Sequence, residues 1–466
     1  MNSNINTIYL KKEVIVDAKH GVMYKMVLPF KDSMSVRDFR ILSKMAAFLM
    51  SCFQGGNTVN NVYLMLSNVF NCDILKAQSA VAAFTRKFQD CLSTDAKDRD
   101  RDERAEQWVK DCVLPRLDYK NGRFEIPLAI TCILTEACDK KCKYCFYDAG
   151  GENAYTRTLN RELVHKLIDE AADLGIQTIT FTGGEPMLYR DLLEVLRHCQ
   201  EKNIETILTT RGGPNPKMAE KLASVGLSQA TVGLDAATEE TAEKLSATPN
   251  IVANTSEFIR ILVESKIRVK VLYIVSKINY SEILQMVALC LDLGVNTLVF
   301  RECAESFGRN DENILLTEKE RNEIETCLSG LHTPTMDIHF TKRIMNMDTP
   351  TVYPTTCRMG KHVMTVRYDG KVIMCDTIIH DDRLIVGDLN TQTIYDVWHS
   401  EAMMKFINPE RSEFSGTICA KCANFDHCSK PQCVYASILA NGRLRSALTQ
   451  CENGQSPIYL TEELDV

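Results

Sequence analysis

The sequence lacks any long hydrophobic segment and any recognisable targeting signal. Its longest apolar run, Ile41 to Phe53, contains Lys44 and Ser51 and is shorter than the roughly 18 residues of a membrane-spanning helix. The first residues, Met-Asn-Ser-Asn-Ile-Asn-Thr, do not form the basic-then-apolar pattern of a secretory signal peptide. We therefore predict a cytoplasmic protein with no membrane partner.

An excess of positive charge is also missing. Lysine and arginine number 54 against 61 aspartates and glutamates, so the net charge of −7 gives no general attraction to nucleic acid. The apolar share of 45% and the charged share of 25% are those of a globular protein. The length of 466 residues is too large for one ordinary core and predicts about three domains.

Cysteine, by contrast, is abundant. The chain has 19 cysteines, and in a reducing compartment these are more often metal ligands than disulfides. Three lie between residues 138 and 145, and seven lie between residues 357 and 451. The other nine occupy mostly apolar contexts, where we expect small buried side chains: Cys52, Cys72, Cys91, Cys112, Cys132, Cys199, Cys290, Cys303 and Cys327.

The stretch from Glu136 to Phe146 carries the strongest signal. It places Cys138, Cys142 and Cys145 in a C-x3-C-x2-C spacing on a loop, because the run before it alternates like a strand. Three thiolates on one loop can hold three corners of an iron–sulfur cube and leave the fourth iron open to a small molecule. A zinc knuckle fits less well, because zinc sites usually close with four ligands in paired spacing. Three buried cysteines are the other alternative.

This motif resembles that of the radical S-adenosylmethionine (SAM) superfamily. The resemblance implies a 4Fe-4S cluster whose open iron binds the amino and carboxylate groups of SAM, with the ring of Tyr144 against the adenine. The segment Thr182-Gly183-Gly184-Glu185-Pro186 is similar to the GGE motif of that family. There the backbone of Gly184, with Glu185 nearby, is expected to receive the ammonium group of SAM, since glycine permits close approach of the backbone.

The middle of the chain alternates between strand-like and helical patterns. Six β/α units predict a parallel sheet with right-handed crossovers. The resemblance implies an α/β fold, the partial (β/α)6 TIM-like barrel of radical SAM enzymes, with the cysteine loop at the rim after the first strand. The predicted strands are Leu128–Leu134, Thr178–Phe181, Thr206–Thr209, Gln229–Leu234, Arg268–Val275 and Thr297–Phe300. The predicted helices include Glu162–Leu174, Leu192–Lys202, Pro216–Ser224, Ser256–Ser265 and Tyr280–Leu293.

Later strands are followed by further candidate residues. Gly233-Leu234-Asp235-Ala236 resembles the Ser-Leu-Asp-Gly segment of many relatives. Asp235 could accept a substrate proton or a hydrogen bond, or it could cap the next helix. Ser276 and Asn279 lie where relatives often contact the ribose of SAM, and Arg301 could pair with the SAM carboxylate. Each of these three could equally be ordinary polarity at the rim.

The second group of cysteines begins with Cys357 and continues with Cys375, which an Asp369-Gly370-Lys371 hairpin turn would deliver. A C-x2-C-x5-C-x4-C run and one later cysteine follow. This pattern closely resembles the SPASM extension, which carries two auxiliary 4Fe-4S clusters. By the resemblance, one cluster binds Cys419, Cys422, Cys428 and Cys451, and the other binds Cys357, Cys375 and Cys433.

Position 363 bears on the chemistry of the first auxiliary cluster. Relatives that modify sulfatases have a further cysteine a few residues after the first, where this chain has Val363. The resemblance therefore implies an open iron that a substrate thiolate could bind. His362 is the alternative fourth ligand.

The first 92 residues combine short strand patterns with three helical patterns. The strands are expected at Thr7–Leu10, Glu13–Val16 and Val22–Leu28, and the helices at Val36–Phe53, Val59–Val69 and Asp73–Leu92, the last capped by Asp73. This order resembles the winged-helix-like RiPP (ribosomally made, modified peptide) recognition element. The resemblance implies that a leader peptide adds as a strand to the edge near Val22–Leu28. A plain structural extension of the barrel is the alternative.

We predict six segments along the chain. They are a recognition-element-like peptide-binding domain at 1–92, a charged linker helix at 93–126, the radical SAM barrel at 127–330, a bridge at 331–355, the SPASM domain at 356–455 and a tail at 456–466.

Taken together, the resemblances imply a radical SAM/SPASM peptide maturase. It would use SAM, one SAM-binding 4Fe-4S cluster and two auxiliary clusters to remove a hydrogen from a precursor peptide. A thioether crosslink between a cysteine sulfur and a carbon would follow, as in sactipeptides and ranthipeptides. A carbon–carbon crosslinking maturase is the first alternative, a formylglycine-forming sulfatase maturase the second, and a non-catalytic iron–sulfur electron carrier the third. The expected partners are the precursor peptide and an external reductant such as flavodoxin or ferredoxin.

Overall fold

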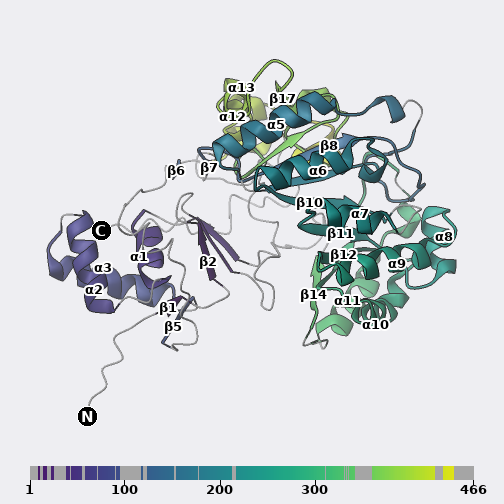
Figure 1. Cartoon of the computed structure of the whole chain (residues 1–466). Helices are drawn as coiled ribbons and strands as arrows, with labels where there is room; N and C mark the ends of the chain where they lie inside the picture. The colour runs from purple at the N-terminus through teal and green to yellow at the C-terminus, as the bar shows by residue number, and fades with distance from the viewer. Residues whose placement is uncertain are drawn as a thin grey trace, which may run out of the picture. The chain divides into compact units, whose positions relative to one another are not determined.

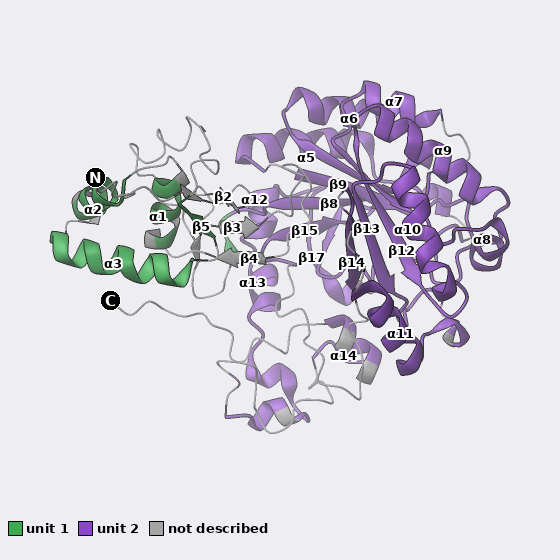
Figure 2. Ribbon diagram, turned by 90° about the horizontal axis from the view of Figure 1, so that it is seen from below, with its two compact units in different colours: residues 1–125 green, residues 126–466 purple. Residues whose placement is uncertain are grey.

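The computed structural model divides into two compact units, Met1–Glu125 and Ile126–Val466, coloured green and purple in Figure 2. It describes the chain outside the following positions: 1–8, 11–13, 18–21, 26–37, 42–43, 55–57, 71, 90, 95–116, 119–122, 152–153, 177, 213–216, 310, 330, 332, 334, 342–358, 424, 426–433 and 446–466. The expected linker helix and the C-terminal tail therefore lie largely or wholly outside the described residues.

The first unit contains a small antiparallel sheet. In this sheet β3 (Val22–Lys25) pairs with both β2 (Val14–Asp17) and β4 (Asp38–Ile41). Two further pairs of short strands join β1 (Tyr9–Leu10) to β5 (Leu92–Ser93) and β6 (Leu117–Asp118) to β7 (Arg123–Phe124).

Three helices complete the first unit: α1 (Lys44–Gln54), α2 (Val59–Phe70) and α3 (Ile74–Lys87). They enclose a core that includes the fully buried rings of Phe48 and Phe53. Asp73 caps α3 as predicted, since its side chain accepts a hydrogen bond from the backbone N–H of Lys76 at 2.9 Å. Likeness of this unit to a recognition element stays a prediction.

Two predictions for this unit are wrong. Residues 38–41, expected within a helix that begins at Val36, form β4, whose backbone pairs antiparallel with β3 over all four residues. The edge expected near Val22–Leu28 is not an edge, because β3 has a partner strand on each side. The outer strands of this described sheet are β2 and β4.

The second unit is built around a ten-stranded sheet in the order β14-β13-β12-β11-β10-β9-β8-β15-β16-β17. Neighbouring strands from β8 to β14 are parallel, and Figure 1 shows them with helices packed against them. All six predicted strands are present, and β14 adds a parallel strand within the expected bridge. Their bounds are β8 (Ala129–Thr135), β9 (Thr178–Gly183), β10 (Glu205–Thr210), β11 (Gln229–Gly233), β12 (Arg268–Val275), β13 (Thr297–Glu302) and β14 (Asp337–Thr341).

The helices between these strands follow ordinary capping rules, as the first of them shows. Asn160 accepts a hydrogen bond from the N–H of Leu163 at the start of α5, and Gly175 ends it with a left-handed φ of 79°. The bounds are α5 (Arg161–Leu174), α6 (Leu192–Glu201), α7 (Met218–Ser224), α8 (Glu239–Ser246), α9 (Ile251–Glu264), α10 (Ile283–Asp292) and α11 (Glu318–Ser329). No helix of the described residues is long and apolar enough to cross a membrane.

The two faces of the parallel sheet differ in burial. On β12, Val271 and Tyr273 are buried in the main hydrophobic core, whereas Lys270 and Leu272 are partly exposed. Helices therefore cover one face, and the other face and the loops at the carboxyl ends of the strands are left for chemistry.

The hairpin of the second cysteine group extends the same sheet. β15 (Val363–Val366) pairs in parallel with β8, and β16 (Lys371–Ile373) pairs with both β15 and β17 (Ile385–Asp388). The predicted hairpin turn is thus confirmed. The remaining helices are α12 (Ile394–Trp398), α13 (Glu401–Ile407) and α14 (Val434–Asn441), and the fully buried Trp398 anchors α12 in the core. Because β15 lies directly beside β8, the hairpin of Cys375 neighbours the strand that leads into the first cysteine loop.

Candidate functional site

The cysteine loop, residues 136–149, follows β8 at the rim of the sheet. All three of its thiols are free; Cys142 is buried, and Cys138 and Cys145 are half-buried. The N–H of Cys145 donates to the carbonyl of Cys142 at 3.3 Å, and the N–H of Asp148 donates to the carbonyl of Cys145 at 3.1 Å. Burial raises the pKa of Cys138 to about 11 and also raises that of Cys142, so binding of iron by their thiolates would release protons. The loop therefore carries the number and type of side chains that a cluster with three protein ligands requires.

Gly183 and Gly184 bring the end of β9 against the base of the cysteine loop. The N–H of Gly184 donates to the carbonyl of Thr135 at 2.7 Å, and the N–H of Glu185 donates to that of Ala137 at 2.7 Å. A Cβ would lie 2.3 Å from the Thr135 oxygen at position 183 and 2.3 Å from the Ala137 oxygen at position 184. Packing between the two loops therefore requires glycine here. The contact of Gly184 with SAM stays a prediction.

The buried carboxylate of Glu185 ties this corner to the next strand. It accepts hydrogen bonds from the hydroxyl of Thr210 at 2.6 Å, the backbone N–H of Arg211 at 3.0 Å and the N–H of Met187 at 3.1 Å. The last of these caps a short 3-10 helix, Pro186–Leu188. Glu185 thus fixes the ends of β9 and β10 relative to one another, and its contact with the SAM ammonium stays a prediction.

Tyr144, Arg211 and Asp235 form a polar network between the cysteine loop and the ends of β10 and β11. The Tyr144 hydroxyl donates to Asp235 Oδ2 at 2.6 Å, Arg211 Nη2 donates to the Tyr144 oxygen at 3.0 Å, and Arg211 forms an ion pair with Asp235. Asp235 Oδ1 also accepts from the N–H of Ile274 at 2.5 Å. Chiefly through burial, the pKa of Tyr144 lies well above its usual range, so the hydroxyl keeps its proton and donates.

The alternative role of Asp235 as a helix cap is wrong, because its carboxylate belongs to this network. Thr238 caps α8, and its side chain accepts from the N–H of Thr241. The carboxylate of Glu282 supports the same turn, since it accepts from the Thr238 hydroxyl at 2.6 Å and the Ala237 N–H at 2.8 Å.

Arg211 was not among the residues predicted from the sequence. Its side chain packs across Gly233, where an added Cβ would lie 3.2 Å from Arg211 Cγ. A usable signal did exist, because Arg211 directly follows a strand and precedes Gly212, and the carboxyl ends of barrel strands carry the chemistry. The same argument had singled out Arg301.

Replacing Asp235 with asparagine is expected to lower the free energy of unfolding of the apoprotein by about 3 kcal/mol, the lower end of the range for breaking a buried ion pair. The lower end applies because the side chain of Arg211 is 21% exposed, whereas that of Asp235 is 3% exposed. Denaturant titration would measure the change. Glu257→Gln is the control: it breaks an ion pair with Arg260 in which both side chains are about half exposed, and should cost less than about 1 kcal/mol. Equal losses in the two variants would show that the Asp235 pair has no special weight.

Ser276 and Asn279 lie after β12 and are fully buried. Asn279 Oδ1 accepts from the N–H of Ser276 at 2.7 Å and from its hydroxyl at 3.0 Å, and Asn279 Nδ2 donates to the carbonyl of Asp235 at 2.7 Å. These contacts fasten the loop after β12 to the end of β11. A contact of Ser276 with ribose stays a prediction.

Arg301 is exposed on β13, at the register position opposite Ile274 of β12. Burial lowers the pKa of Lys270, and the charge of Arg301 adds to this effect. Burial raises the pKa of Asp376, the residue after Cys375, although the charge of Arg301 opposes the rise. A cation in this place suits a carboxylate ligand, and pairing with SAM stays a prediction.

The structure describes only part of the second cysteine group. Cys375 and Cys419 are buried, and Cys422 is half-buried. Cys375 packs in a cluster with Ile378 and with Val434 of α14. Within the described residues, no group of three or more His, Cys, Asp or Glu side chains is arranged to hold a metal ion. Both auxiliary ligand sets stay predictions, and their other members lie outside the described residues: Cys357, Cys428, Cys433 and Cys451.

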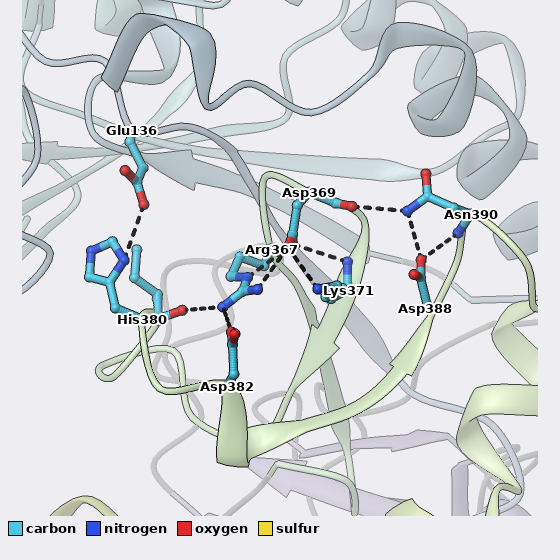
Figure 3. A network of polar contacts seen from close by, with 9 residues as sticks. Glu136, Arg367, Asp369, Lys371, His380, Asp382, Asp388 and Asn390 are labelled. Atoms are coloured by element: carbon cyan, nitrogen blue, oxygen red, sulfur yellow. Dashed lines mark hydrogen bonds and ion pairs between the residues drawn. The ribbon is translucent and has the colours of Figure 1, made fainter. Parts of the chain in front are cut away.

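The loop after Cys375 meets the cysteine loop at His380. His380 Nε2 lies 3.2 Å from the carbonyl oxygen of Tyr147. Its Nδ1 lies 3.5 Å from Glu136 Oε1, as Figure 3 shows. The other oxygen of Glu136 pairs with Arg157 at 2.7 Å. These residues line a cavity of about 240 Å³ between the two loops.

Arg367 holds the loop that carries His380. Its Nη1 donates to the carbonyl of Ile379 at 2.8 Å and to Asp382 Oδ1 at 2.9 Å, and its Nη2 donates to Asp369 Oδ2 at 2.7 Å (Figure 3). The guanidinium is almost completely buried, so this fork of charged hydrogen bonds is a rigid support for the hairpin of Cys375.

Comparison with known proteins agrees with this geometry. Residues 132–290 match the radical SAM superfamily, and residues 357–423 match an iron–sulfur cluster-binding domain, SPASM. The probable GTP 3′,8-cyclase of Saccharolobus solfataricus is 30% identical over 181 residues, 38% of this chain and 57% of that protein. The PqqA peptide cyclase of Granulibacter bethesdensis is 24% identical over 283 residues, 59% of this chain and 74% of that protein. The chain therefore spans just over half of the length of the first of these relatives.

Among solved structures, Streptococcus suis SuiB bound to precursor peptide SuiA aligns with a TM-score of 0.62, covering 95% of this chain and 98% of that one. At 13% sequence identity this likeness shows the fold. The two domain matches therefore show that this chain contains a radical SAM segment, which includes the three thiols of the cysteine loop, followed by a SPASM iron–sulfur cluster-binding segment.

Proposed function

We propose that this enzyme modifies a ribosomally made precursor peptide and installs thioether crosslinks within it. The observation that carries the proposal is the pairing of β15 with β8. It places the hairpin of Cys375 and the first cysteine loop around one hydrophobic cluster, which contains Ile133, Tyr147 and Ile373 and packs against Cys138 and Cys145. Two neighbouring loops that would each carry an iron–sulfur cluster suit a reaction that needs both a radical and a thiol. The relative named PqqA peptide cyclase and the likeness to peptide-bound SuiB favour a peptide as the substrate.

The thioether part of the proposal rests on Val363. If the β15–β16 register continued two residues beyond the Thr365–Ile373 pair, at which β16 ends, Val363 would lie opposite Cys375. Valine cannot bind iron, so a cluster on Cys357, Cys375 and Cys433 would keep a position for a peptide thiolate. His362, the alternative fourth ligand, is buried in the turn directly before β15.

The chain's own residues would hold and orient the reactants. When bound, the 4Fe-4S cluster and SAM would supply the radical chemistry that removes a hydrogen atom from a substrate carbon, and an auxiliary cluster would accept the electron released when the carbon–sulfur bond forms. Asp235 and Arg211 fix the hydroxyl of Tyr144 and thereby the plane of the ring that we expect against the adenine. The contacts of Gly184 and Glu185 fix the height of the cysteine loop above the sheet. Arg301 offers a cation to the carboxylate of SAM.

Two partners complete the proposal. A leader segment would bind the first unit by strand addition, at β2 or β4 rather than at β3. An external one-electron reductant such as flavodoxin or ferredoxin would reduce the clusters, one binding SAM and two auxiliary.

The test is the mass and thiol content of a cysteine-containing precursor peptide after anaerobic incubation with enzyme, SAM and reductant. A thioether removes a pair of hydrogen atoms and also one thiol that can be alkylated. A product that lacks the hydrogens but keeps every thiol would be carbon–carbon crosslinked, and the thioether proposal would be wrong.

Val363→Cys is expected to lower thioether formation by at least about tenfold, because a cysteine there can take the position meant for the peptide thiolate. Cleavage of SAM should stay within about twofold of the wild type, since the first cluster is untouched. Val363→Ala is the matched control, which changes the size of the side chain without adding a thiol. Undiminished crosslinking by Val363→Cys would contradict the open position.

A further inference from the structure

Arg309 contacts the cysteine loop at four points. Its backbone N–H donates to the carbonyl of Cys145 at 2.9 Å. In its side chain, Nε donates to Asp148 Oδ1 at 2.8 Å, Nη1 donates to the carbonyl of Cys142 at 3.3 Å, and Nη2 donates to the carbonyl of Ala149. One residue thus spans the loop from its second cysteine to its last residue.

The loop after β13 is shaped to deliver this arginine. An added Cβ at Gly308 would lie 2.2 Å from the carbonyl oxygen of Cys145, so only glycine allows the backbone to come this close. On its other side the ring of Phe307 packs edge-on against Tyr435 of α14, with ring centroids 5.9 Å apart. Contacts on both sides therefore fix the segment that carries Arg309.

The charge of Arg309 is only partly compensated. Its partner Asp148 is 62% exposed, whereas the Arg309 side chain is 23% exposed. Water screens the carboxylate more strongly than the guanidinium, so the field at the cysteines keeps a net positive contribution from Arg309. Arg157 differs, because it is 45% exposed and its partner Glu136 is buried.

We propose that Arg309 is a positioning residue that holds the cysteine loop and makes the reduction potential of its cluster less negative. The inference rests on the proposal that Cys138, Cys142 and Cys145 hold the SAM-binding cluster. Reduction adds one negative charge to a 4Fe-4S cluster, and nearby positive charge and hydrogen bonds stabilise the reduced form. Arg309 supplies the charge directly, and its three carbonyl contacts keep the loop around it in one shape.

The experiment measures the midpoint potential of the cluster by EPR-monitored redox titration of the reconstituted full-length enzyme. The signal that changes when SAM is added identifies the SAM-binding cluster among the three. In Arg309→Gln, the ratio of reduced to oxidised cluster at the wild-type midpoint should fall about tenfold, which is about 59 mV for one electron. Arg309→Lys keeps the positive charge but loses the planar guanidinium that contacts several loop atoms at once. Its ratio of reduced to oxidised cluster should stay within about threefold of the wild-type ratio, while the protein binds less iron.

Asp148→Asn tests the electrostatic part in the opposite direction. Asp148 has a left-handed φ of 52°, which asparagine tolerates, so the loop keeps its shape while Arg309 loses its counter-charge. The reduced-to-oxidised ratio at the wild-type midpoint should rise by about threefold or more. Lys143→Gln is the control, because it removes an exposed charge from the same loop and should leave the midpoint unchanged.

The outcomes separate the inference from the proposal beneath it. Unchanged midpoints in Arg309→Gln and Asp148→Asn would overturn the role of Arg309, and so would shifts in the same direction. If Arg309→Gln fails to bind iron, Asp148→Asn decides alone: a raised midpoint supports the role and an unchanged or lowered one overturns it. A wild-type enzyme without a SAM-responsive signal would instead overturn the cluster assignment.

Discussion

Gly184→Ala should lower the free energy of unfolding by about 3 kcal/mol and reduce the iron bound by the cysteine loop. The new methyl group would lie 2.3 Å from the carbonyl oxygen of Ala137 and 2.7 Å from that of Glu136. Both obstacles are backbone atoms of the loop that carries Cys138, so relief requires the loop to move away from β9. That movement would strain or break the hydrogen bonds that Gly184 and Glu185 donate across the gap, each 2.7 Å long.

Gly151→Ala is the matched control for this experiment. Among the residues that the structure describes, a Cβ at Gly151 would meet only the Asp148 carbonyl oxygen, at the ordinary contact distance of 3.9 Å. Its stability should change by less than about 1 kcal/mol. Denaturant titration of the apoprotein and iron analysis of the reconstituted protein measure the two effects separately. Wild-type stability and iron content in Gly184→Ala would show that close packing of the two loops is not what requires glycine.

The strands of the parallel sheet could be predicted because each is a local pattern. Runs such as Arg268–Val275 alternate regularly, and each is separated from the next by a helical period. Pairing between distant segments produces no comparable local pattern in the sequence. Nothing in the four residues Val363–Val366 indicates that they lie beside β8, which is more than two hundred positions earlier. The same limit explains β4, whose strand character depends on its pairing with β3.

The candidate site divides in the same way. Spacing within a few residues predicted Cys138, Cys142 and Cys145 as ligands and the glycines after β9 as a close approach, because cluster motifs and tight turns are local features. Arg211 and Arg309 were missed, because each acts on residues from other strand ends. A charged residue near the end of a strand can be found in the sequence, but its partner cannot. The predicted contact with SAM is also not the only reason for the two glycines. Gly183 and Gly184 are required by the packing of the two loops, whether or not SAM contacts them.

The cysteine sets can be separated by replacing each as a group. Cys138→Ala/Cys142→Ala/Cys145→Ala should lower the iron content from about twelve to about eight and abolish SAM cleavage, because the loop would lose every ligand of its cluster. Cys357→Ala/Cys375→Ala/Cys433→Ala should also bind about eight irons, yet keep SAM cleavage and lose the crosslinked peptide. Equal SAM cleavage by both variants would contradict the proposal that the first cysteine set cleaves SAM and the second set serves crosslinking.

Cys290→Ala is the control for these variants, because Cys290 is a completely buried thiol on α10 that packs against Met286. It should cost stability but leave the iron content unchanged. Mössbauer spectra before and after addition of a cysteine-containing precursor peptide then address the open position opposite Cys375. A site in the wild type that changes with the peptide, and does not change in Val363→Cys, supports thiolate binding there. About twelve irons with no response to the peptide would favour carbon–carbon coupling, and only about four in the wild type would mean that the auxiliary clusters are absent.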